Sequence, residues 1–163
     1  MKYLLNVLVL LILISTTSVA QKPAAIIPEF NFFKLDNTSF TNRNLEQGKQ
    51  LFFVFFDTDC DHCQHAIKDI NEHYTAFNKT AVYLITQDVK GKIDVFINKY
   101  GKNLKGKKNI TILQDLKLEF ITKFSPKKYP SMFLYSADKK LILYDDNEQN
   151  IPNFLQKIKV PVK

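Results

Sequence analysis

Cysteine, histidine and tryptophan are scarce in this chain of 163 residues, which contains two cysteines, three histidines and no tryptophan. Both cysteines and two of the histidines fall within one short stretch, CDHCQH. A structural zinc site needs four ligands, and the only histidine outside this stretch is His73, so such a site is not expected. A Cu(I) ion held by the thiolates of Cys60 and Cys63 stays an alternative. Gln64 follows the second cysteine, which excludes the Cys-x-x-Cys-His pattern of covalent haem attachment.

Arginine is nearly absent, and the formal net charge of +7 comes almost wholly from lysine. A nucleic-acid-binding protein would be expected to carry arginines and interleaved aromatic residues on its basic surface. We therefore expect no nucleic-acid partner. The lysines between Lys99 and Lys108 are expected to form a solvated face that at most steers acidic partners.

Only one long apolar run is found near the N-terminus, and it is short for a membrane span. It covers eleven residues, Leu4 to Ile14, whereas a spanning helix needs about 20. With Lys2 before it and small residues up to Ala20 after it, the run predicts a signal peptide over residues 1–20. No cysteine stands directly after this run, so a lipid-modified N-terminus of the bacterial lipoprotein kind is not expected. We expect a periplasmic or otherwise extracytoplasmic protein, attached to a membrane only if this segment is uncleaved.

The rest of the chain has the length and composition of one globular domain. Residues 21–29, with two prolines, are expected to be a linker, and residues 30–163 a domain that is a monomer. An extracytoplasmic compartment allows disulfides to persist. Because the chain has no other thiols, its two cysteines can pair only with each other or with another molecule.

Apolar periodicity predicts alternating strands and helices. Strands are expected at Phe30–Leu35, Gln50–Phe56, Ala81–Thr86, Ile110–Leu113, Ser131–Tyr135 and Leu141–Tyr144. Helices are expected at Cys60–Phe77, Lys92–Tyr100, Leu116–Phe124 and Ile151–Ile158, with a helical turn at Asn44–Gln47 and Asp59 as the N-cap of the first long helix. The order is a βαβ unit followed by ββα, which places the chain in the α/β class.

A Cys-x-x-Cys pair between a buried strand and a helix, with Tyr129-Pro130 opening a later hairpin, resembles the thioredoxin superfamily. The closer likeness is to secreted bacterial thioredoxin-like proteins of the redoxin and TlpA type, from about Phe30 to Ile158. The resemblance implies a thioredoxin-like fold, with a central mixed β-sheet flanked by helices and an N-terminal strand extension. It also implies a thiol–disulfide oxidoreductase without a bound cofactor, whose partners are client thiols or disulfides and a redox partner protein.

The spacing of the two cysteines suits thiol–disulfide exchange. Cys60 would lie at the helix N-terminus, where the helix dipole stabilises a thiolate, and is expected to be the nucleophile. Cys63, one turn later, is expected to resolve the mixed disulfide. The residues between them are expected to tune the reaction: a protonated His62 favours the thiolate, whereas Asp61 and neighbouring carboxylates oppose it.

The family pattern also gives a role to Pro130, and three positions depart from it. In the family the matching proline has a cis peptide bond, and the backbone of the residue before it, here Tyr129, pairs with the client. The tryptophan usual before the first cysteine is Asp59 here. Acids common on the preceding strand and after the second cysteine are replaced by Val54 and Ala66. The proton acceptor for the second cysteine is therefore not identified.

Two other functions compete with this assignment. A peroxidase of the peroxiredoxin kind would carry a threonine three residues before its cysteine, and Asp57 stands there. A fold that has kept only a passive disulfide would be a redox-inactive binding module. The copper(I) carrier that uses the same two cysteines stays a separate alternative. The sequence leaves open whether an active pair reduces, oxidises or isomerises its clients.

Overall fold

The computed structural model describes residues 22–159, so the expected signal peptide lies outside the described residues. Its central element is a seven-stranded mixed sheet with the strand order β2-β1-β5-β4-β3-β6-β7. The strands are β1 (Asn31–Lys34), β2 (Ser39–Thr41), β3 (Leu51–Phe55), β4 (Ala81–Thr86), β5 (Ile110–Gln114), β6 (Ser131–Tyr135) and β7 (Leu141–Asp145). β3, β4 and β5 are parallel, and the other neighbouring pairs are antiparallel.

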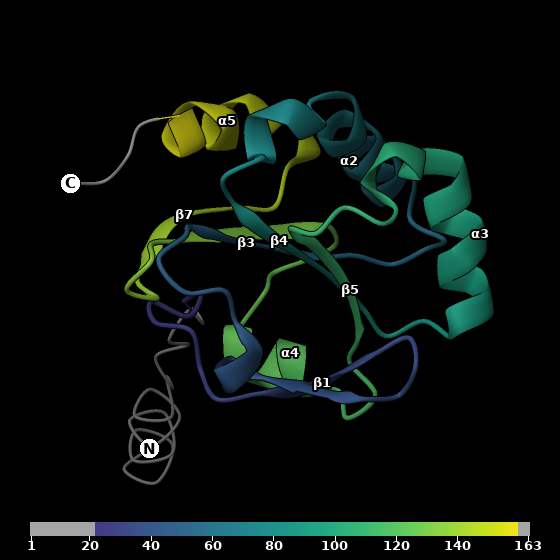
Figure 1. Ribbon diagram of the computed structural model, residues 1–163, viewed down its shortest axis with the longest axis horizontal. Coiled ribbons are helices and arrows are strands. Elements are labelled where there is room, and N and C mark those ends of the chain that lie inside the picture. The colour runs from purple at the N-terminus through teal and green to yellow at the C-terminus, as the bar shows by residue number, and fades with distance from the viewer. Residues whose placement is uncertain (1–21, 160–163) are drawn as a thin grey trace, which may run out of the picture.

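Helices cover both faces of this sheet. They are α2 (Asp61–Glu72), α3 (Lys90–Tyr100), α4 (Glu119–Phe124) and α5 (Ile151–Lys159), with 3₁₀ turns η1 (Asn42–Asn44), η2 (Tyr74–Phe77), η3 (Lys102–Leu104) and η4 (Glu148–Asn150). Figure 1 shows α2, α3 and α5 on one side of the sheet and α4 on the other. Among residues 22–159, no helix is long and apolar enough to cross a membrane.

This architecture confirms the predicted α/β class and thioredoxin-like fold, and all six predicted strands are present. β1 and β2 pair as an antiparallel hairpin, which forms the N-terminal strand extension that the resemblance implied. The first helical turn lies at Asn42–Asn44 instead of Asn44–Gln47, because the Thr41 side chain accepts a hydrogen bond from the Arg43 amide and so caps the turn earlier. The first long helix ends at Glu72 and resumes as the η2 turn.

α4 begins three residues later than the sequence predicted. Leu118 adopts a left-handed backbone conformation with φ of 55°, which a continuous helix from Leu116 would not allow. Asp115, fully buried, then accepts hydrogen bonds from the amides of Glu119 (2.8 Å) and Phe120 (2.9 Å). A buried carboxylate bonded to these first amides marks where the helix starts.

The segment expected to be a linker is bonded to the domain. Ala24 donates its amide to the carbonyl of Phe124 at 3.0 Å, and Ala25 accepts a hydrogen bond from Leu141 at 2.8 Å. The side chain of Ile27 is buried. The segment therefore packs along the domain instead of separating from it.

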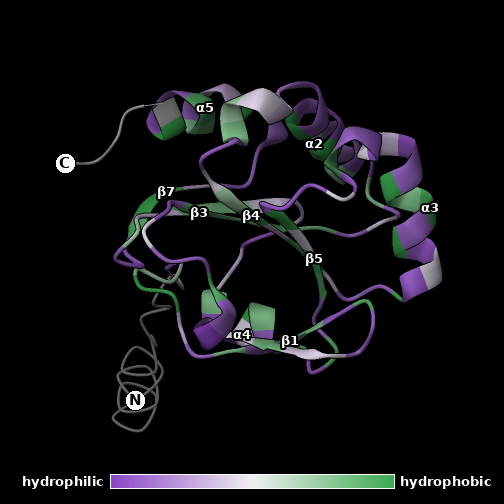
Figure 2. Cartoon of the chain, in the orientation of Figure 1, coloured by the Kyte–Doolittle hydropathy of each residue, from purple (hydrophilic) through white to green (hydrophobic). Residues whose placement is uncertain are grey.

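The core has two layers because β3 is buried on both faces, as its continuous apolar run predicted. Phe52 and Val54 pack with α2, α3 and α5, whereas Phe53 and Phe55 pack with α4. Figure 2 shows apolar residues along the central strands and on the inward sides of the helices. Successive side chains of a strand point to opposite faces, so one phenylalanine-rich strand supports both layers. β3 is thereby fixed, and the chain leaves it directly toward the cysteines.

Candidate redox site

The loop between β3 and α2 is held by its own backbone amides. The Asp59 amide donates to the Asp57 carboxylate at 2.8 Å, and the Thr58 amide donates to the Asp88 carboxylate at 2.9 Å. Asp88 comes from the loop after β4, the neighbouring parallel strand. The carboxyl ends of two adjacent parallel strands therefore set the path of the chain into the cysteine pair.

Cys60 is the N-cap of α2, so the expectation that Asp59 would cap this helix was wrong. The Cys60 carbonyl accepts hydrogen bonds from the amides of Cys63 (3.0 Å) and Gln64 (3.1 Å). Asp59 turns away because its carboxylate pairs with Lys92 of α3. No side chain caps the first amides of α2. The positive end of the helix dipole is consequently directed toward Cys60, which is half-buried.

Cys63 is buried one turn further along α2, and its sulfur faces a backbone amide. The Asp57 amide donates to Cys63 Sγ at 3.5 Å. Burial raises the pKa of the Cys63 thiol well above its ordinary value, and interaction with Cys60 and the charge of Asp57 act in the same direction. The two thiols thus differ: Cys60 can be reached from solvent, whereas Cys63 is held as a protonated thiol behind it.

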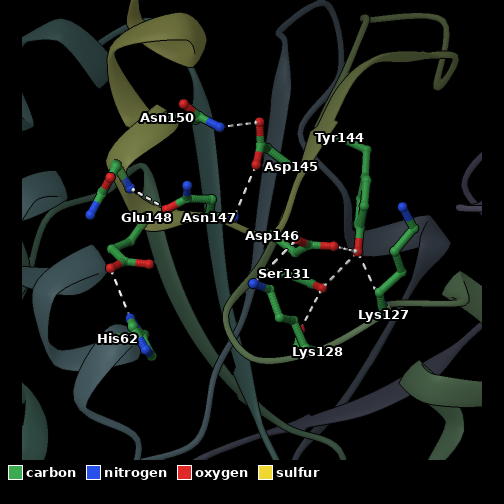
Figure 3. A network of polar contacts seen from close by, with 11 residues as sticks. His62, Lys127, Lys128, Ser131, Tyr144, Asp145, Asp146, Asn147, Glu148 and Asn150 are labelled. Atoms are coloured by element: carbon green, nitrogen blue, oxygen red, sulfur yellow. Dashed lines mark hydrogen bonds and ion pairs between the residues drawn. The ribbon is translucent and has the colours of Figure 1, made fainter.

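The ring of His62 is paired with the side chain of Glu148. His62 Nδ1 lies 2.9 Å from Glu148 Oε1, and the two residues are 86 positions apart in the sequence. The Glu148 side chain is 14% exposed and the His62 side chain 71% exposed, so the carboxylate is the fixed member of the pair (Figure 3). Burial would raise the pKa of Glu148, but the hydrogen bond and the charge from His62 outweigh it and lower that pKa.

Asp61 is the first residue of α2 and is exposed. A carboxylate in the first turn of a helix is favoured by the helix dipole, which gives Asp61 a structural reason to stand there. The tuning roles of Asp61 and His62 in catalysis stay predictions.

The peptide bond between Tyr129 and Pro130 is cis, as the resemblance implied. Ser131, the first residue of β6, pairs with Phe55 in the antiparallel register of β6 and β3. Extending this register places Pro130 beside Phe56 and Tyr129 beside Asp57. The Tyr129 ring packs on Phe55 with a centroid separation of 4.8 Å. The proline loop therefore lies next to the start of the cysteine loop.

The phenol of Tyr129 is part of the same site. Its hydroxyl donates to Gln87 Oε1 at 3.3 Å. Burial, followed by the negative charge of Asp57, raises the pKa of Tyr129 to about 12. Tyr129 and Cys60 also pack against the same apolar cluster, which contains Cys63. The fold thus brings together four of the residues that the sequence singled out: Cys60, Cys63, Tyr129 and Pro130.

Sequence reasoning missed Glu148 and the backbone donor to Cys63. Nothing in the local pattern around Glu148 marks it, since its partner lies on a helix far away in the chain. Within residues 22–159, no three His, Cys, Asp or Glu side chains come together in a way that could hold a metal ion. The two free thiols that a Cu(I) ion would need are both present.

Comparison with solved structures shows the same fold at low sequence identity. A secreted disulfide oxidoreductase from Mycobacterium tuberculosis, homologous to E. coli DsbE, aligns with a TM-score of 0.62 at 19% identity, covering 78% of this chain and 95% of that one. A thiol-disulfide oxidoreductase from Bacteroides fragilis gives a TM-score of 0.63 at 18% identity, with 82% and 98% covered. A peroxiredoxin-like protein from Aquifex aeolicus gives 0.63 at 13% identity, with 85% and 88% covered. No curated protein sequence matches the chain.

The fold and the cysteine pair define a protein of the thioredoxin superfamily. Residues 23–144 match the AhpC/TSA family, and the chain belongs to that family. This membership confirms the redoxin resemblance drawn from the sequence. It makes the chain an enzyme of the thiol–disulfide oxidoreductase or peroxiredoxin-like class, with the direction of exchange left open.

The difference in burial between the two thiols predicts their order of alkylation. When the reduced native protein is treated with iodoacetamide near pH 8, Cys60 should be modified first. Cys63 should react only after denaturant is added, because burial both covers it and disfavours its thiolate. Peptide mapping by mass spectrometry measures the two yields. Equal labelling of both cysteines in the native protein would contradict the assignment.

The His62–Glu148 pair predicts a pH dependence of stability. Because the pKa of Glu148 is lower in the folded than in the unfolded state, its ionised carboxylate stabilises the fold at pH values above the unfolded-state pKa. This stabilisation is lost as the pH falls through the folded-state pKa. Wild-type protein should therefore lose its advantage over Glu148→Gln between about pH 5 and pH 3, by under about 1 kcal/mol because His62 is exposed. Urea titrations across this range measure the difference. Glu72→Gln, on the exposed surface of α2, is the control, and an advantage that survives below pH 3 would refute the pairing.

Proposed function

We propose that this protein carries out thiol–disulfide exchange with protein clients, using Cys60 as the nucleophile and Cys63 as the resolving thiol. The observation that carries the proposal is the asymmetry of the pair. Cys60 is half-buried at the uncapped N-terminus of α2, whereas Cys63 is buried one turn behind it, with its amide bonded to the Cys60 carbonyl. A thiolate at a helix N-terminus that is open to solvent is the form of cysteine that attacks disulfides.

The proposed reaction has two balanced steps. The Cys60 thiolate attacks one sulfur of a client disulfide, forming a mixed disulfide and releasing the other client sulfur as a thiolate. Cys63 then loses its proton and attacks Cys60, which forms the Cys60–Cys63 disulfide and releases the second client thiol. The client gains two electrons and the enzyme loses them. The reverse sequence oxidises a client, and a redox partner protein restores the starting state in either case.

Cys63 must give up its proton before it attacks, and we propose that the Asp57 carboxylate accepts this proton. Asp57 already touches Cys63 through its amide, and its charge acts on the Cys63 thiol. The positions where related proteins carry acids hold Val54 and Ala66, both fully buried and apolar. Asp57 supplies a carboxylate in their place.

The backbone around the proline loop supports a client-binding role for Tyr129 and Pro130. Within the described residues, the backbone amides and carbonyls of 126–130 make no hydrogen bond with other backbone groups. Proline has no amide hydrogen, so the polar backbone groups of Tyr129 are the ones available beside it. An extended client segment could pair with them as an added strand, with its disulfide next to Cys60.

We further propose that the protein works outside the cytoplasm. The N-terminal pattern of Lys2, an apolar run and small residues up to Ala20 supports export, and a secreted disulfide oxidoreductase shares the fold. The mature protein would then start at Gln21. N-terminal sequencing of protein recovered from the extracytoplasmic fraction should give Gln21, and an intact Met1 in that fraction would contradict cleavage.

Single cysteine variants test the proposed roles. Cys63→Ser should accumulate mixed disulfides between Cys60 and its clients, because the resolving thiol is missing. Cys60→Ser should lose exchange with insulin almost completely. Non-reducing electrophoresis after acid quenching, with mass spectrometry of the trapped species, measures both results. Equal trapping by the two variants would exclude the assigned order.

Two further measurements test the proton acceptor and the copper alternative. Asp57→Asn should form mixed disulfides at the wild-type rate and resolve them more slowly. Anaerobic titration with Cu(I) beside the insulin assay tests the copper carrier. Tight binding of one copper ion without any exchange activity would replace the proposed function, and the absence of both would leave a binding module.

A further inference from the structure

The loop that presents Tyr129 is held in place by side chains. It joins α4 to β6, and within residues 22–159 its residues 126–130 form no backbone-to-backbone hydrogen bond. A client strand could pair with this backbone only if the loop kept its shape without such bonds. Something else must therefore fix its conformation.

The hydroxyl of Tyr144, on β7, is the centre of the contacts that fix it. It accepts a hydrogen bond from the Lys127 amide at 3.0 Å and lies 3.1 Å from Ser131 Oγ. It also donates to the Asp146 carboxylate at 3.1 Å. Figure 3 shows these three groups converging on the hydroxyl from the loop, from β6 and from the end of β7. One oxygen atom thus joins the loop and the first residue of β6 to β7.

The core sets the position of this hydroxyl. The Tyr144 ring packs edge-to-face on buried Phe133, with a centroid separation of 4.7 Å. Burial raises the pKa of Tyr144, and its contacts with the Ser131 hydroxyl and the Lys127 amide only partly offset the rise, to which the charge of Asp146 adds. The phenol consequently stays neutral and keeps its proton for Asp146. A neutral hydroxyl on a packed ring is a rigid attachment point.

Two contacts next to the hydroxyl hold the residue before Tyr129. Ser131 Oγ donates to the Lys128 carbonyl at 2.7 Å. The Lys128 ammonium lies 3.6 Å from the second oxygen of the Asp146 carboxylate. Residues on both sides of Tyr129 and Pro130 are therefore bonded to the Tyr144 hydroxyl or to its direct partners. Among residues 22–159, the backbone amide and carbonyl of Tyr129 form no hydrogen bond with another backbone group, so they are available to a client strand.

We infer that Tyr144 is a positioning residue for client binding: its hydroxyl keeps the loop in the shape to which an extended polypeptide pairs. The inference rests on the proposed exchange function and adds a residue that touches neither cysteine. The inference predicts that loss of the Tyr144 hydroxyl affects two kinds of substrate differently. An extended polypeptide needs the loop, whereas a small disulfide needs only access to Cys60.

Tyr144→Phe removes the hydroxyl and keeps the ring on Phe133. Saturation kinetics of disulfide exchange between the reduced protein and insulin should show a half-saturating concentration raised by about fivefold, the ratio expected for losing one ordinary hydrogen bond. The maximal rate should stay at the wild-type value. The second-order rate constant with 5,5′-dithiobis(2-nitrobenzoate), a small disulfide, should stay within about twofold of wild type.

Two controls make the result specific. Tyr74→Phe also deletes one hydrogen-bonded hydroxyl, from the contact of Tyr74 with Asn109 at the far end of α2, and should leave the insulin kinetics unchanged. Amide hydrogen exchange, followed by NMR, should speed up at Lys127 in Tyr144→Phe, because that amide loses its acceptor. A purely stabilising role would lower thermal stability without altering the insulin half-saturation.

The outcomes are distinguishable. An unchanged insulin half-saturation in Tyr144→Phe, with the Lys127 amide exchanging faster, would overturn the inference and leave the proposed function standing. Equal losses with insulin and the small disulfide would also overturn it, because they would mean that Tyr144 acts on the cysteines. A wild-type protein that reacts with neither substrate would overturn the proposed function and this inference together.

Discussion

The site depends on the burial of β3 on both faces. Its five residues are all buried, and phenylalanines from this one strand pack into both layers of the core. A strand fixed in this way cannot shift, so the loop that follows it delivers Cys60 to one place. Hydrogen bonds from the Thr58 and Asp59 amides to carboxylates then guide the chain into α2. The position of Cys60, the proposed nucleophile, is thus a consequence of core packing.

Once Cys60 is placed, the helix divides the two thiols by environment. A turn of helix carries Cys63 under the surface, where its thiol is covered and its ionisation is disfavoured. Thiol–disulfide exchange is favoured by such a difference, because the attacking thiolate must be accessible to the client and the resolving thiol must react only after the mixed disulfide has formed. The same short segment therefore supplies two cysteines with different chemistry.

The segment from Tyr144, near the end of β7, to Asn150, just before α5, connects both halves of the site. Tyr144 and Asp146 bond to the proline loop, and Glu148 pairs with His62 between the cysteines. Within the segment, Asp145 accepts hydrogen bonds from the Asn147 amide (2.9 Å) and the Asn150 side chain (2.9 Å) (Figure 3). A change in this segment would reach the proline loop and the first turn of α2 at once.

Much of this arrangement was predictable from the sequence, because short sequence patterns indicate the main features of the site. The apolar run of β3, the Cys-x-x-Cys spacing and the Tyr129-Pro130 pair each lie within a few residues. The start of α4 was not predictable, because the left-handed backbone of Leu118 follows from the buried Asp115 cap. The contact between His62 and Glu148 spans 86 residues, so only the folded chain reveals it.

The proposed function requires Cys60 and Cys63 to exchange two electrons as a pair. The most direct test equilibrates the protein in glutathione or dithiothreitol buffers of graded potential and follows the disulfide by mass. We predict one intramolecular disulfide between Cys60 and Cys63, formed in a single two-electron transition with a midpoint between about −270 and −120 mV. The absence of a two-electron transition, or oxidation only to intermolecular dimers, would contradict the proposed exchange by the Cys60–Cys63 pair.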